Sequence, residues 1–72
     1  MIKIDKVGII TKGKDKGFQI KVGKATDNKG GYYIFMCSDF SNPDQNIGDH
    51  YVDSYQDLEE EFLEFDWGIK WL

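Results

Sequence analysis

The feature that most limits the fold is the run of residues 32–37, which is apolar at every position (Tyr-Tyr-Ile-Phe-Met-Cys). Successive side chains of a strand point to opposite faces, so this run presents apolar groups to both sides of any sheet that it joins. We therefore predict that it forms the central strand. Turn-forming residues flank it, with glycines before it and residues 38–49, which include Pro43, after it.

The N-terminal half predicts two further strands. Residues 2–10 alternate between apolar and polar with one slip in phase, which indicates a strand with a bulge or a bend. Residues 12–17 contain two glycines and three lysines, as expected at the tip of a hairpin. Residues 18–22 alternate again and predict a half-buried strand, and residues 26–31 predict a second reversal.

The last third predicts a helix followed by a strand. Residues 50–53 are compatible with a short extended piece. Ser54 and Asp57 have the spacing of a capping box, so we expect the helix to begin at Ser54. The apolar stripe of this helix, expected to face the sheet, consists of Tyr55, Leu58, Phe62 and Phe65. Gly68 and the alternation of residues 67–71 predict a final strand.

These elements predict an α+β fold in the order β-β-β-α-β, a small antiparallel sheet with one amphipathic helix packed on one face. A length of 72 residues predicts a single domain over 1–72. The single cysteine, Cys37, cannot form an internal disulfide and suggests a reducing cytoplasm. The first residues do not resemble a signal peptide, and no apolar stretch approaches about 20 residues, so we expect no membrane association.

Charge is divided unevenly along the chain and points to a charged partner. Residues 1–29 hold eight of the nine lysines, and residues 30–72 hold ten of the thirteen acidic residues. On the predicted helix, four acids point away from the apolar stripe: Asp57, Glu60, Glu61 and Glu64. They repel one another at a spacing of four residues, and no lysine lies within the helix. They form either an ordinary solvated face, which lysines of the sheet could balance, or a docking surface for a basic protein.

Aromatic residues suggest a second contact surface, because one helix can cover only one face of the sheet. The other face could be covered by the loop of residues 38–49, by a second subunit, or by a partner that binds an exposed patch. The aromatic residues predicted to take part in an interface are Tyr32, Tyr33, Trp67 and Trp71.

Catalytic, metal and cofactor sites are not predicted. His50 beside Asp49 could be an oriented general base, but its one possible thiol partner, Cys37, lies in a strand expected to be buried. The acids and amides of residues 39–49 do not match a calcium loop. Lysines near the first hairpin could bind nucleic acid, but a pI near 4.7 and the lack of arginine argue against it.

Residues 50–54, 58–62 and 65–72, with the ending Trp-Gly-Ile-Lys-Trp-Leu, resemble the end of small bacterial immunity-type proteins of polymorphic toxin systems. The resemblance implies a cytoplasmic, non-catalytic inhibitor that masks a cognate toxin, and it transfers no catalytic residue. We hypothesise that the acidic helix face neutralises a basic toxin or nuclease. The alternatives are a homodimeric structural module and a small nucleic-acid binder that uses the lysine-rich hairpin.

Overall fold

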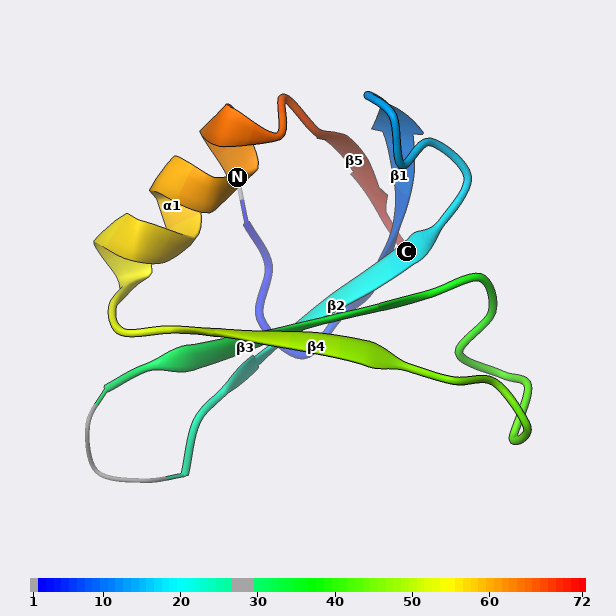
Figure 1. The fold of residues 1–72 in the computed structure, drawn as a ribbon, viewed down its shortest axis with the longest axis horizontal. Helices are drawn as coiled ribbons and strands as arrows, with labels where there is room; N and C mark the ends of the chain where they lie inside the picture. Colours follow the sequence, from blue (N-terminus) through cyan, green and yellow to red (C-terminus); the bar gives the residue numbers. More distant parts are fainter. Residues whose placement is uncertain (1, 27–29) are drawn as a thin grey trace.

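The computed structural model describes residues 2–26 and 30–72 as an α+β fold, which confirms the predicted class. The elements in chain order are β1 (Val7–Lys12), β2 (Gln19–Lys24), β3 (Tyr32–Cys37), β4 (Gly48–Val52), α1 (Tyr55–Glu64) and β5 (Gly68–Trp71). The strands form one antiparallel sheet in the order β4-β3-β2-β1-β5, and α1 lies over one of its faces (Figure 1). In the part of the chain that is described, no helix is long and apolar enough to span a bilayer.

The sheet has one more strand than predicted, and this changes the position of β3. Of the short extended piece predicted at residues 50–53, residues 50–52 belong to the edge strand β4, which pairs along β3 from Tyr32 opposite Val52 to Met36 opposite Gly48. The polar residues Asp49 and His50 hid this strand, because an edge strand needs few apolar side chains. β3 is therefore interior, but β2 and not β3 occupies the centre of the sheet.

The helix carries the chain from one edge of the sheet to the other, because β4 and β5 are consecutive in sequence but lie at opposite edges (Figure 1). Ser54 is the N-cap, as predicted, and its side chain accepts a hydrogen bond from the Asp57 amide at 3.1 Å. The helix ends because Asp66 adopts a left-handed conformation with φ of 54°, a position that glycine usually fills. The chain then enters β5 two residues later.

The register places the core between α1 and one face of the sheet. The buried cluster consists of Ile10, Ile20, Val22, Ile34, Val52 and Leu58. Leu58 is fully buried and is the one buried residue of α1, while Phe62 packs at the edge of the cluster. Tyr55 and Phe65, also expected to face the sheet, lie at the margin and are each 39% exposed. On β1, Gly8 leaves room for the last strand, because a Cβ there would lie 2.6 Å from Ile69 Cγ2.

The opposite face of the sheet has the segment between β3 and β4 against one of its ends. The segment between β3 and β4 folds over this end, where the Phe40 amide donates to Gln19 Oε1 at 2.8 Å and Cys37 is buried. Within the segment, hydrogen bonds from the Ser41 hydroxyl and amide lower the pKa of Asp39. The loop thus provides part of the predicted cover.

The structure bears on three predictions about the N-terminal half: the hairpin tip, the slip in phase and the second reversal. Gly13 and Gly17 both have φ of 99° in the turn between β1 and β2, which confirms the hairpin tip. The phase slip in residues 2–10 is a bend at Asp5, where φ is 60°, and β1 starts only at Val7. The predicted reversal at residues 26–31 lies partly outside the described residues.

The packing predicts that two leucines of the same helix differ sharply in their contribution to stability. Leu58→Ala should lower the free energy of unfolding by about 2–5 kcal/mol, because it leaves a cavity beneath α1. Leu63→Ala is the matched control and should change stability by less than about 0.5 kcal/mol, since Leu63 is 79% exposed. Urea unfolding followed by circular dichroism measures both. Equal losses would contradict the placement of α1.

Candidate partner-binding surface

The acids of α1 line a shallow groove beside β4, which we call the acidic groove. Its volume is about 330 Å³, and it is lined by His50, Tyr51, Val52, Asp53, Asp57, Glu60, Glu61 and Glu64. Glu60 and Glu64 are exposed, as predicted, whereas Asp57 and Glu61 are half-buried. The prediction that Glu61 points away from the apolar stripe is therefore wrong: its side chain is 25% exposed because it turns toward the sheet to meet His50.

The acids of the groove have no lysine partners within residues 2–26 and 30–72. The ion pairs there are His50 Nε2 with Glu61 Oε1 at 3.1 Å and Lys12 Nζ with Asp66 Oδ2 at 3.2 Å. Within the described residues, the Glu60 carboxylate accepts one hydrogen bond, from the Gln56 side-chain amide at 3.4 Å. The described lysines of the N-terminal half therefore form no ion pair with the acids of the groove, although they outnumber the acids in their own part of the chain.

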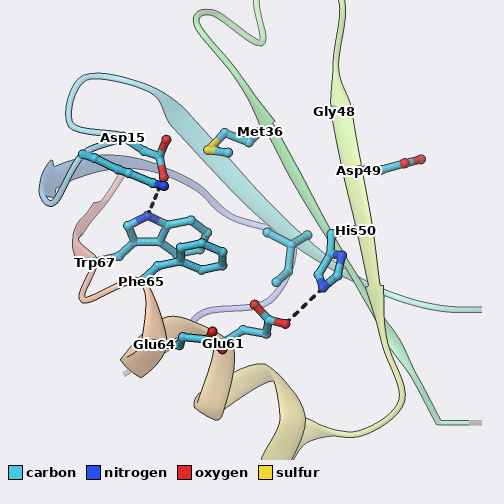
Figure 2. A pocket seen from close by; sticks show the side chains of 11 residues that line it. Asp15, Met36, Gly48, Asp49, His50, Glu61, Glu64, Phe65 and Trp67 are labelled. Carbon is cyan, nitrogen blue, oxygen red and sulfur yellow. Dashed lines mark hydrogen bonds and ion pairs between the residues drawn. The ribbon is translucent and has the colours of Figure 1, made fainter.

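A second cavity, larger than the acidic groove, opens beside it, and we call it the hairpin pocket (Figure 2). Its volume is about 510 Å³, and it lies between the C-terminal half of α1, the β1–β2 turn and strands β3 and β4. The residues that line it are Lys14, Asp15, Ile34, Met36, Gly48, Asp49, His50, Glu61, Glu64, Phe65 and Trp67. Glu61, Glu64 and His50 line both cavities, so the two form one continuous surface.

One wall of the hairpin pocket is aromatic. The rings of Phe65 and Trp67 stack with their centroids 4.9 Å apart and an angle of 14° between their planes. Trp67 Nε1 donates a hydrogen bond to Asp15 Oδ2 at 3.1 Å, which ties this wall to the hairpin turn. His50 lies on the other side of the pocket, beside Glu61 (Figure 2). The pocket thus combines flat apolar rings with carboxylates.

The structure brings together some of the predicted interface residues and separates others. Trp67 lies in the hairpin pocket with Glu61 and Glu64. Trp71 lines a different groove, on the other side of α1, together with Ile2, Tyr55, Glu59, Phe62, Leu63, Trp67 and Ile69. Tyr32 lies on the helix side of the sheet against Tyr55, with ring centroids 5.8 Å apart. Tyr33 lies on the opposite face, 37% exposed, and its ring meets that of Tyr51, which lines the acidic groove.

Sequence reasoning missed the part played by His50 and Asp15. The pairing of Asp49 as a partner for His50 fails, because neighbours in a strand face opposite sides and the partner of His50 is Glu61. The alternation of His50 with Val52, which is buried, was the available signal that His50 points toward the helix. No local pattern marks Asp15, because its contact with Trp67 spans 52 residues of sequence.

Comparisons with known proteins found no match to this chain among protein-family models, curated proteins or solved structures. Among the described residues, no group of three or more His, Cys, Asp or Glu side chains is arranged to hold a metal ion.

The contact between Asp15 and Trp67 predicts different effects for two substitutions. Asp15→Ala removes the acceptor and should lower the free energy of unfolding by about 0.5–1.5 kcal/mol. Asp15→Asn keeps a side-chain oxygen and should retain most of this stability. The Trp67 indole N–H resonance, assigned with Trp67→Phe, should move much farther in the alanine variant than in the asparagine variant. Equal shifts in both variants would mean that this hydrogen bond does not form.

Proposed function

We propose that this chain is a non-catalytic protein-binding module, an immunity-type inhibitor that neutralises a basic toxin or nuclease in the cytoplasm. The observation that carries the proposal is the acidic groove, whose carboxylates have no lysine partners in the part of the chain that is described. The resemblance of the C-terminal third to immunity-type proteins agrees with this role.

The acidic groove makes physical sense as a recognition surface. The pairs Asp57/Glu61 and Glu60/Glu64 each oppose helix formation by about 0.2–0.5 kcal/mol, because like charges repel at this spacing. A basic partner relieves this repulsion when it binds. Complementary charge also speeds encounter, and it disfavours acidic proteins as partners.

The aromatic contribution to this contact comes from Trp67. It adjoins Glu61 and Glu64 in the hairpin pocket, where a partner that covers the acidic groove also reaches it. Buried aromatic anchors contribute most of the binding free energy in many interfaces, while charges at the rim contribute mainly to the rate of association. We therefore assign the contact to Asp57, Glu60, Glu61, Glu64 and Trp67.

A homodimer is the second candidate function, and an aromatic group on the sheet face opposite the helix favours it. Tyr33 stacks on Phe35 with ring centroids 5.9 Å apart and meets Tyr51 edge to face at 5.2 Å. A second copy could pair with this aromatic group, and the acids would then serve solubility. The lysine-rich hairpin gives weaker support for nucleic-acid binding, because Lys12 pairs with Asp66 and Lys14 adjoins the carboxylates of the hairpin pocket.

Charge reversal on α1 tests the proposed function. The tagged chain is used to capture proteins from its own host, and a captured protein supports the proposal if it is basic, toxic when expressed alone, and harmless when co-expressed with this chain. Glu60→Lys combined with Glu64→Lys should weaken binding of that protein by about 100-fold or more, because like charges then face each other. Titration calorimetry measures the affinity.

The control variant has the same change in net charge, but at residues outside the acidic groove. Glu59→Lys combined with Asp44→Lys leaves the acidic groove intact, since neither residue lines it. This variant should bind within a few fold of the unmodified chain. Equal losses in the two variants would show that net charge and not the groove determines binding. If no basic protein is captured and the molecular mass of the chain in solution doubles as its concentration is raised, the homodimer is supported instead.

A further inference from the structure

We propose that the hairpin pocket binds one arginine side chain. That the arginine comes from a loop of the basic partner rests on the proposed function. That the pocket prefers arginine rests on the geometry of the pocket itself. The inference goes beyond a diffuse acidic surface, because it names one socket and the side chain that fills it.

The size and lining of the pocket suit a long side chain with a charged end. Its volume of about 510 Å³ lies within the range of about 300–1,000 Å³ that is usual for ligand pockets. Ile34 and Met36 supply an apolar floor from β3. Arginine and lysine bury their methylene groups against such surfaces and keep their charge at a polar rim.

The charges around the pocket select a cation. Three carboxylates line it from α1 and the hairpin turn: Asp15, Glu61 and Glu64. The Asp15 carboxylate accepts from Trp67, and the Glu61 carboxylate meets His50. Within the described residues, the Glu64 carboxylate has neither a hydrogen bond nor an ion pair, so it is available to a ligand. Lys14 is the one lysine of the lining, and Asp49 points away from the others (Figure 2).

The aromatic wall selects arginine over lysine. The guanidinium group is planar and weakly hydrated, so it stacks on aromatic rings while it donates two parallel hydrogen bonds to a carboxylate. Phe65 and Trp67 offer such rings next to Glu64. The ammonium group of lysine is compact and strongly hydrated, and it gains less from a flat wall.

A small probe tests the pocket without any partner protein. N-acetyl-arginine methylamide is titrated into the isotope-labelled chain and followed by two-dimensional NMR. We expect saturable shifts at the Trp67 indole and at the amides of Met36 and His50, with a Kd of about 1–10 mM for a ligand of this size. N-acetyl-lysine methylamide should bind several fold more weakly, and N-acetyl-norleucine methylamide should not saturate.

Two isosteric variants provide the matched comparison. Glu64→Gln removes the available carboxylate and should weaken binding of the arginine probe about tenfold. Glu59→Gln removes the same charge from a position outside the pocket and should leave the Kd unchanged. The inference is overturned if the arginine probe does not saturate, if the lysine probe binds as tightly, or if the two variants behave alike.

The outcomes separate this inference from the proposed function. If the arginine probe binds in a Glu64-dependent way but the chain captures no basic toxin, the pocket stands and the proposed function fails. If a basic toxin is captured through the acidic groove while the arginine probe does not bind, the proposed function stands and the arginine pocket is wrong.

Discussion

The structure depends on the contact of Leu58 with the buried face of the sheet. This side chain is fully buried and fixes α1 as the helix crosses from the edge at β4 to the edge at β5. Once Leu58 points inward, helical geometry directs Glu60 and Glu64 outward and leaves Glu61 beside His50. The acidic groove and the hairpin pocket are therefore consequences of how one helix is seated, and both lie where α1 meets β4.

Much of the fold could be predicted from the sequence, because its elements rest on local patterns. The hairpin glycines, the Ser54 cap and the apolar stripe around Leu58 each specify a nearby backbone conformation. The edge strand β4 was predicted only as a short extended piece, because its polar residues resemble a loop and its pairing partner is provided by β3. The order of the strands also depends on pairing between distant segments, which no short pattern encodes.

The candidate site was predictable only in part. The outward direction of Glu60 and Glu64 follows from helical periodicity alone. The hairpin pocket does not, because its walls come from the hairpin turn, two strands and the end of the helix, and meet only in the folded chain. The contact of Asp15 with Trp67 and that of His50 with Glu61 are the clearest cases. Each depends on a register that the sequence does not display.

The central claim is that the helix acids repel one another and have no lysine partners among the residues that the structure describes. The salt dependence of stability tests this claim most directly. Up to about 0.3 M NaCl screens charges, since the Debye length falls below about 10 Å. Salt therefore weakens either the repulsion among the acids or their attraction to lysines, whichever dominates. The free energy of unfolding should rise with salt, and the rise should shrink in a variant with Glu60→Gln and Glu64→Gln. A free energy of unfolding that falls with salt would mean that lysines already pair with these acids, and would contradict the account.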